Sequence, residues 1–582
     1  MNEAVDQMRA DYDAAPYDSL AFPQSAPGQL AAIAYLFGLA TPEVSTARVL
    51  EIGCAAGGNL IAFAAGHPQA SAVGIDLSQV QIDQGRRRVQ GLGLGNLELL
   101  AGDIARMNLA PLGQFDFIIC HGVYSWVPEK VQEAILSAFH RSLAPEGVAY
   151  VSYNVYPGWK AKEIVRDAMM LFGGDRGTPD EKVRYARGMI DFLEEVAPPE
   201  RVLTRALADY KAVAGDARDY YLLHEELEAF NTPCYFLEML ERARGHGLAY
   251  LAEARPEVMF VGNFGRRVAE QLLTECGHSQ VLLEQYLDFV VNRTFRQSLL
   301  VHAERAPQIR YQLDRSRYRR LHFAAWVPPA DAKTRLDDSR QEYGESGEAT
   351  VFTHDPGLKA ALDSLNARWP WTMSRQELLD AVQARLCSAG IDAAAKLEAR
   401  VDHLLEVLIL QGQLHYRLDP VLPNPAPTPP RLDEPARRMA ELTRGDADAS
   451  TFNLWHETLA LSPVDRHLLP LLDGTRDRDA LVEALLAIAR EDLIRFERDG
   501  KRVSGEAELR KVLAEHIDAM PQTLARMKLL RASDQAEAGR RSFLGSGGRR
   551  VRSSATSRRP SPPNEILHDS RGSSGPPSRR SS

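Results

Sequence analysis

Two carboxylates bracket a run of small residues, an arrangement suited to a ligand that carries both a cationic group and hydroxyl groups. Glu51 lies in an apolar stretch, residues 49–52, that leads into a small-residue loop, residues 53–58. A helix is expected from Leu60, and a second apolar stretch ends at Asp76. Strand, loop, helix and strand in this order predict the first unit of a doubly wound sheet, whose ligands bind at the carboxyl ends of the strands.

The loop between these strands does not suit a nucleotide phosphate. A dinucleotide needs G-x-G-x-x-G at the start of a helix, and Gly53, Gly57 and Gly58 lack that spacing. Glu51 would repel a pyrophosphate but attract an ammonium group. S-adenosylmethionine has an amino-acid end, a ribose and a sulfonium but no phosphate, so it is the predicted cofactor. The position of Asp76 fits either ligand, and its carboxylate would accept both ribose hydroxyls.

The end of the third expected strand supplies a further contact for this cofactor. Asp103 and Ile104 suit the adenine amino group and the adenine ring face, although Asp103 alone could instead cap a helix. The predicted cofactor contacts are Tyr17, Glu51, Gly53, Cys54, Gly57, Asn59, Asp76, Leu77, Asp103, Ile104 and His121.

Aromatic clusters follow the fourth and fifth expected strands, where the transferred methyl group would lie. Neutralising a lysine acceptor at pH 7 costs roughly 4–5 kcal/mol, and a dry aromatic pocket lowers that cost by desolvation. Any single buried aromatic is more often core than site, and no obligatory general base stands out. The predicted catalytic residues are Trp126, Tyr153 and Asn154, with Tyr153 or Asn154 orienting the lysine nitrogen; the predicted substrate contacts are Tyr124, Trp126, Tyr156 and Trp159.

The periodicity of the chain places these residues on an α/β scaffold. Strands are expected at residues 49–52, 72–75, 97–99, 115–120, 148–153, 248–252 and 295–302, with helices at 30–37, 79–90, 131–143 and 235–246. The helix at 30–37 is expected to cover the ligand cleft. Strands that alternate with helices predict parallel pairing and a Rossmann-like α/β fold.

Composition shifts divide the chain further. We predict a cofactor domain at 1–157 and 232–305, a helical insertion at 158–231, a middle winged-helix-like domain at 306–420, a Pro-rich linker at 421–434, a C-terminal, mainly helical domain at 435–533 and a disordered tail at 534–582. Within the middle domain, Ser374 and Glu377 form an expected capping box, and residues 412–418 an expected wing strand.

These motifs resemble a known family. Residues 51–59, 102–104, 121–128 and 152–159 are similar to class I S-adenosylmethionine-dependent methyltransferases that carry a methyltransferase regulatory domain, among them rickettsial protein-lysine methyltransferases that act on an outer-membrane protein. The resemblance spans about residues 12–300 and implies an insertion associated with dimerisation, hence a homodimer, and trailing domains that help hold substrate. One departure is Ala55, which stands at a loop glycine; alanine disfavours positive φ.

The composition argues against several classes of partner and against a metal site. A net charge of -9 does not favour a polyanion, although the tail carries arginine pairs such as Arg540 and Arg541. No apolar run is long enough to span a membrane, and the amino terminus lacks the pattern of a signal peptide. The 5 cysteines are scattered, so we expect no metal site and a cytoplasmic protein.

The sequence therefore predicts a methyltransferase acting on lysine side chains of a protein. A small-molecule or natural-product methyltransferase is one alternative. The other is a cofactor-sensing DNA-binding regulator, but the recognition-helix candidate at residues 394–408 has mixed charge and no basic stripe, which argues against nucleic acid.

Overall fold

The computed structural model describes residues 2–14, 16–17, 19–174, 177–214, 226–277, 279–331, 333–344, 351–392, 396–421, 429–498, 501–503 and 505–529. The predicted tail, half of the predicted Pro-rich linker (residues 422–428) and residues 215–225 of the insertion lie outside these ranges. No helix among the described residues is long and apolar enough to cross a membrane.

A seven-stranded sheet forms the centre of the first domain, with the strand order β3-β2-β1-β4-β5-β7-β6. The neighbours β3, β2, β1, β4 and β5 pair in parallel, and β7 runs antiparallel to both β5 and β6. The predicted Rossmann-like sheet is thereby confirmed. The strands are β1 (Arg48–Ile52), β2 (Ser71–Asp76), β3 (Leu97–Ala101), β4 (Phe115–Cys120), β5 (Leu143–Asn154), β6 (Leu248–Glu253) and β7 (Phe295–His302).

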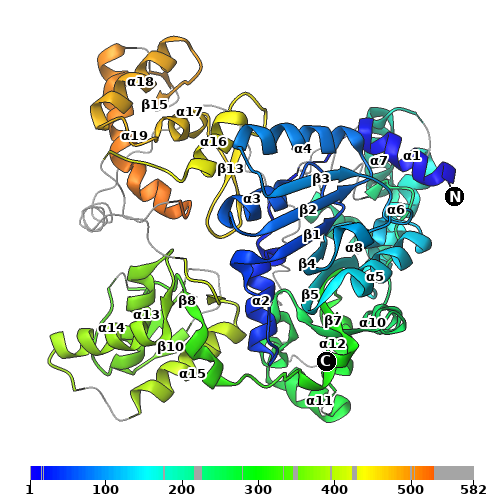
Figure 1. Cartoon of the computed structure of the whole chain (residues 1–582), viewed down its shortest axis with the longest axis horizontal. Helices are drawn as coiled ribbons and strands as arrows, with labels where there is room; N and C mark the ends of the chain where they lie inside the picture. Colours follow the sequence, from blue (N-terminus) through cyan, green and yellow to red (C-terminus); the bar gives the residue numbers. More distant parts are fainter. Residues whose placement is uncertain are drawn as a thin grey trace, which may run out of the picture.

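Helices cover both faces of this sheet (Figure 1). Because side chains alternate along a strand, Phe117 and Ile119 of β4 join the core under one set of helices, and Ile118 and Cys120 join the core under the other. The first set is α2 (Pro27–Leu36), α3 (Gly58–Gly66) and α4 (Gln79–Leu92); the second includes α5 (Glu129–Ser142) and α10 (Phe236–Gly245). The helices α11 (Arg266–Cys276) and α12 (Gln280–Val291) precede β7.

The predicted insertion is helical in its described part. It contains α6 (Gly158–Met169), a π-helical turn (Met170–Gly174), α7 (Pro179–Val196) and α8 (Val202–Ala214). A capping box between Thr178 and Glu181 fixes the start of α7. Val165, Ile190 and Leu207 belong to a buried cluster that all three helices share and that is separate from the core of the sheet.

The middle module combines a three-stranded sheet, β11-β8-β12, with three helices and a two-stranded hairpin. The expected capping box of Ser374 and Glu377 is present, and the expected wing strand is β12. The elements are β8 (His322–Ala324), β9 (Gln341–Tyr343), β10 (Val351–Thr353), α13 (Pro356–Arg368), β11 (Met373–Ser374), α14 (Arg375–Ser388), α15 (Leu397–Leu410) and β12 (His415–Arg417).

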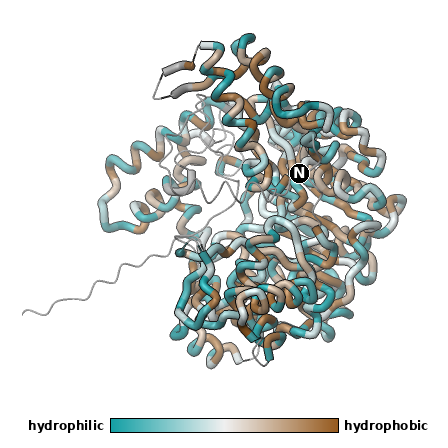
Figure 2. The backbone as a smooth tube through the Cα atoms, turned by 90° about the vertical axis from the view of Figure 1, so that its left-hand side faces the viewer, coloured by the Kyte–Doolittle hydropathy of each residue, from teal (hydrophilic) through white to brown (hydrophobic). Residues whose placement is uncertain are grey.

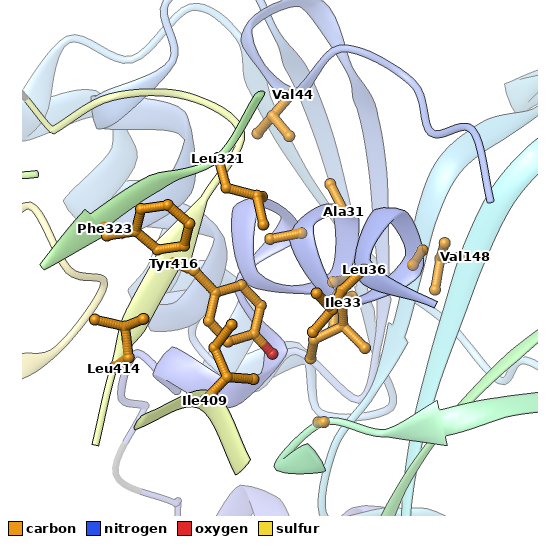
Figure 3. Packing of buried hydrophobic residues seen from close by; sticks show 14 of the residues in the cluster. Ala31, Ile33, Leu36, Val44, Val148, Leu321, Phe323, Ile409, Leu414 and Tyr416 are labelled. Carbon is orange, nitrogen blue, oxygen red and sulfur yellow. The ribbon is translucent and has the colours of Figure 1, made fainter. Parts of the chain in front are cut away.

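Helix α2 joins this middle module to the sheet. Figure 3 shows Tyr416 and Phe323 of the module on one side of α2 and Val148 of β5 on the other, with Ile33 and Leu36 between them. All of these side chains are buried in one hydrophobic cluster. The middle module and the first domain therefore share a core.

The C-terminal module has a core of its own, to which its four helices all contribute. Its elements are α16 (Glu434–Leu442), β13 (Ser450–Phe452), β14 (Thr458–Ala460), α17 (Asp465–Leu468), α18 (Arg478–Arg490), β15 (Glu497–Arg498), β16 (Lys501–Arg502) and α19 (Glu506–Arg526). Leu442 of α16 packs so closely on α4 that a Cβ at Gly91 would lie 2.9 Å from it. Brown and teal stretches alternate along the outer helices in Figure 2, as expected when each helix buries one face.

Candidate active site

A cavity of about 200 Å³ lies at the carboxyl ends of β1, β2 and β4. Most of the predicted cofactor contacts line it, together with Trp126 of the first aromatic cluster. Gly57 does not; its φ of 74° shapes the turn into α3 behind the cavity, beside Leu99. The predicted residues that line the cavity are Tyr17, Glu51, Gly53, Cys54, Asn59, Asp76, Leu77, Asp103, Ile104, His121 and Trp126.

Glu51 presents a buried carboxyl oxygen without a partner. Its Oε1 accepts a hydrogen bond of 2.8 Å from Nδ2 of Asn59, but Oε2 is buried and has no hydrogen-bond partner. Burial raises the pKa of Glu51 to about 8, while the Asn59 bond opposes the shift. A ligand ammonium group would supply the missing partner and favour the ionised carboxylate. This atom fits the amino-acid end of S-adenosylmethionine.

Asp76 ends β2 with both oxygens held by backbone donors. Oδ2 accepts from the backbone N–H of Ala55 at 2.7 Å, and Oδ1 accepts from that of Ser78 at 2.9 Å. Each carboxylate oxygen keeps a further lone pair for a ribose hydroxyl. Burial is the main cause that raises the pKa of Asp76.

The loop that donates to Asp76 holds an alanine in a left-handed conformation. Ala55 adopts a φ of 51°, in the left-handed region that the sequence analysis expected alanine to resist. Its bond to Asp76 stabilises this conformation. Gly53 of the same loop has no room for a side chain, because a Cβ there would lie 2.2 Å from a methyl group of Val123.

Asp103 caps a turn, not the helix that the sequence allowed, and its adenine contact stays a prediction. Its Oδ1 accepts from the backbone N–H of Ala105 at 2.9 Å, which caps the turn after β3. The side chain also lines the cavity beside Ile104, where an adenine ring would lie. The cap therefore fixes the carboxylate in the position predicted for the adenine contact.

His121 and Phe22 form an aromatic wall at the end of β4. Their ring centroids lie 4.1 Å apart, and Nδ1 of His121 lies 2.8 Å from the Tyr150 hydroxyl. Burial lowers the pKa of His121 to about 4, so the ring is neutral at pH 7. A neutral imidazole does not repel a sulfonium or an incoming ammonium group.

The other predicted aromatic residues lie outside the cavity. Successive side chains on β5 point to opposite faces of the sheet, so Tyr153 points away from the face that Ser152 takes. The Tyr153 hydroxyl lies 3.0 Å from Oγ of Ser298. Asn154 donates from Nδ2 to Oδ1 of Asn231 at 3.0 Å. The roles predicted for these two residues stay predictions.

The remaining members of the predicted substrate set lie near the cavity without lining it. Tyr124 is buried in the core, with its ring 6.3 Å from that of Tyr153. Trp159 meets Trp126 edge to face at 5.9 Å. The Tyr156 hydroxyl, just before α6, donates to Oε1 of Glu163 in that helix at 2.5 Å.

The sequence analysis missed the helix that covers this cavity. Val5, Met8 and Tyr12 line it from α1 (Asn2–Ala14), whereas no residue of α2 does. The helix at 30–37 was therefore assigned the wrong place: α2 packs between the sheet and the middle module. The spacing of Val5, Met8 and Tyr12 is that of one helical face and was the available signal.

Three family models match parts of this chain. Residues 49–147 match a methyltransferase domain, residues 218–302 a predicted methyltransferase regulatory domain, and residues 430–529 the C-terminal winged helix domain of PKMT. An uncharacterised protein of Rickettsia prowazekii (strain Madrid E) is 30% identical over 511 residues, which cover 86% of this chain and 90% of the relative. A second such protein of that organism is 35% identical over 240 residues, or 40% of this chain and 94% of the relative.

A solved structure adds the ligand. PKMT2 from Rickettsia typhi in complex with AdoHcy matches 88% of this chain and 100% of its own, with a TM-score of 0.77 and 27% identity. The chain belongs to the S-adenosylmethionine-dependent methyltransferases with a methyltransferase regulatory domain. Its cofactor is S-adenosylmethionine. Among its described residues, no group of three or more His, Cys, Asp or Glu side chains could hold a metal ion.

In this methyltransferase the cofactor cavity adjoins a larger cleft of about 1640 Å³. Ser19, Leu20 and Phe22 line both spaces, so one segment of chain forms the wall between them. Residues from the first domain, β12 of the middle module and the β13–β14 hairpin line the cleft. Its charged lining consists of Glu43, Glu257, Asp419, Asp433, Glu434, Asp446, Asp448 and Glu457 against Arg88, Arg255 and Arg417.

Proposed function

We propose that this methyltransferase transfers methyl groups to lysine side chains of a protein substrate that binds in the cleft. The observation that supports this most strongly is the acidic cleft beside the cofactor cavity. Its volume of about 1640 Å³ exceeds the roughly 300–1000 Å³ of a typical small-molecule pocket. A polypeptide segment fills a cleft of that size more completely than a metabolite does.

The charge of the cleft favours the same class of substrate. Its lining carries eight carboxylates and three arginines. Four of the carboxylates, Glu257, Glu434, Asp446 and Glu457, form ion pairs, and the remaining excess of negative charge favours a lysine-bearing segment. PKMT2 from Rickettsia typhi shares the fold, and the C-terminal winged helix domain takes its name from PKMT. Both likenesses are consistent with a protein acceptor.

The chemistry requires mainly positioning. The bound cofactor supplies an electrophilic methyl group on a sulfonium, and well-oriented donor and acceptor groups can contribute about 7–11 kcal/mol of the barrier. In this proposal Glu51 and Asp76 hold the amino-acid and ribose ends, and Asp103 and Ile104 hold the adenine. Phe22 lines both the cavity and the cleft, so the uncharged wall of His121 and Phe22 lies where the acceptor amine would approach. Desolvation at this wall favours the uncharged form of the amine.

Labelled cofactor tests the acceptor class. The protein is incubated with methyl-labelled S-adenosylmethionine and either a protein extract or a small-metabolite extract of the same cells. We expect label in macromolecules, released as methyl-lysine by acid hydrolysis, and an Asp76→Ala variant as the inactive control. Label confined to small molecules would establish the small-molecule alternative, and salt-sensitive binding of duplex DNA would favour the regulator.

We also propose that the insertion, residues 158–231, forms a homodimer contact. Its described helices keep a separate core yet expose large apolar side chains: Leu171 (86%), Val202 (66%), and Phe172, Phe192 and Val196 (each 55%). Apolar residues gathered on one small module are typical of a protein interface. The separate cluster, which contains no residue of the sheet, supports treating the insertion as a module of its own.

A further inference from the structure

A loop of the C-terminal domain reaches the cofactor site. Residues 453–457 join β13 to β14, which lie beside α3 of the first domain (Figure 1). Nε2 of His456 in this loop lies 2.7 Å from Oδ1 of Asn59, 397 positions away in sequence. Asn59 lines the cofactor cavity, whereas His456 lines the cleft and is 9% exposed. One hydrogen bond therefore joins a wall of the cleft to a wall of the cavity.

The direction of this bond follows from the neighbours of Asn59. The backbone N–H of Phe22 donates to the same Oδ1 at 3.0 Å, and a backbone N–H can only donate, so this atom is the amide oxygen. His456 must therefore donate from Nε2. Burial, with help from nearby Arg417, lowers the pKa of His456 to about 3, so the ring stays neutral and keeps a proton on Nε2.

The nitrogen of the Asn59 amide donates to the carboxyl group of Glu51, the predicted partner of the cofactor's amino group. Nδ2 donates to Oε1 of Glu51 at 2.8 Å and to Oγ of Ser25 at 3.1 Å. Oε2 of Glu51 is the buried atom without a partner. With both ends of the amide occupied, Asn59 cannot rotate, and the orientation of Glu51 depends on it.

The loop itself is built to hold His456 in an unusual conformation. The φ of His456 is 60°, a left-handed conformation that residues other than glycine rarely adopt. Oδ1 of Asn453 accepts from the backbone N–H groups of Trp455 and Glu457 at 2.9 and 3.1 Å and closes the loop. Nε1 of Trp455 donates to the carbonyl of Pro370 at 2.9 Å and ties the loop to the middle module.

A second hydrogen bond from the same hairpin holds the segment, residues 19–22, that separates the cavity from the cleft. The Thr458 hydroxyl oxygen accepts from the backbone N–H of Ala21 at 2.7 Å. Ala21 lies between Leu20 and Phe22, which line both the cavity and the cleft. The hairpin therefore contacts the cofactor site at two independent points.

We propose that the C-terminal winged-helix domain completes the cofactor site, with His456 as a positioning residue that holds Glu51, through Asn59, toward the amino group of S-adenosylmethionine. Cofactor affinity then depends on the docking of a domain that contributes no atom to the cofactor cavity. The proposal uses the cofactor and is independent of the lysine acceptor, so an error about the acceptor leaves it intact.

Titration calorimetry of the full chain with AdoHcy, without any acceptor, tests the proposal. Loss of a hydrogen bond worth about 0.5–1.5 kcal/mol predicts a roughly 2.3- to 13-fold higher Kd for His456→Ala. His456→Gln keeps an N–H donor of similar reach and should bind within about twofold of the unaltered chain. Arg478→Ala is the control, because it removes an exposed ion pair with Asp518 in the same domain, away from the loop, and should leave the Kd unchanged.

A double-mutant cycle separates positioning from general destabilisation. If His456 acts through Glu51, His456→Ala should have little further effect in a Glu51→Gln background; independent effects would add. Additive effects, or a His456→Ala variant that binds AdoHcy within twofold of the unaltered chain, would overturn the proposal. His456→Phe, which fills the space without a donor, serves in place of His456→Ala if thermal melting shows that the alanine variant is unfolded.

Discussion

Cofactor binding should expel a proton from Glu51. In the free protein burial raises the pKa of this carboxyl to about 8, so at pH 6.5 about 97% of it is protonated. An ammonium group placed at the unpartnered Oε2 stabilises the ionised form and lowers that pKa. The cofactor's amino group, with an ordinary pKa of about 7.7–8.0, is already almost fully cationic at pH 6.5. Binding should therefore release about 0.9 proton at this pH.

The same linkage sets the sign and size of the pH dependence. Free Glu51 must lose its proton before it can pair with the ammonium group, so affinity rises as pH approaches the free pKa of about 8. Between pH 6 and pH 7 the Kd for AdoHcy should fall roughly eightfold after allowance for the ligand's amino group. Above pH 8 the ligand loses its own charge, so affinity should fall again.

Calorimetry in two buffers of different ionisation enthalpy measures the released protons directly. Glu51→Gln should abolish the release and the rise in affinity between pH 6 and pH 7. It should also bind AdoHcy on the order of 10- to 100-fold more weakly at pH 8, since a hydrogen bond to a charged group is lost. Glu43→Gln, which alters the cleft and not the cavity, should leave the proton count unchanged. Release of fewer than about 0.2 proton by the unaltered chain would refute the assigned pairing.

Three further outcomes follow from the geometry. Asp76→Ala removes both acceptors offered to the ribose and the anchor of the loop at Ala55, so calorimetry should detect no AdoHcy binding; unchanged affinity would contradict the cofactor contacts. Leu171→Glu places a charge on the exposed apolar surface of the insertion, and sedimentation equilibrium should show monomer where the unaltered chain shows dimer. Tyr153→Phe loses a buried hydrogen bond to Ser298 and should lower Tm, with labelled turnover retained; a large loss of turnover at unchanged AdoHcy affinity would instead support the predicted catalytic role.

The sheet was predictable because its signals are local. Apolar stretches of strand length, separated by helical periodicity, identified all seven strands, with ends displaced by up to five residues, the most at the start of β5. The predicted cofactor contacts rest on the same pattern, since Glu51, Asp76, Asp103 and His121 lie on strands or shortly after their ends. In a doubly wound fold such positions converge on one edge of the sheet.

The acceptor side was harder because the sequence indicates a strand but not which face each residue takes. Tyr150 and Tyr153 are three positions apart on β5, so their side chains point to opposite faces. The hydroxyl of Tyr150 lies 2.8 Å from His121 beside the wall, whereas Tyr153 is held in the core under α5. Both residues are aromatic and both lie in a buried strand, so composition alone does not separate them.

Contacts between distant parts of the chain were beyond sequence analysis for a different reason. In the sequence nothing distinguishes His456 from other polar residues in turns, because its partner Asn59 lies 397 positions away. Its loop also lines the cleft, so a substrate that shifts the loop must change the energy of the Asn59 bond. By linkage, a cofactor that draws Glu51 toward its ammonium group must then change substrate affinity by the same factor.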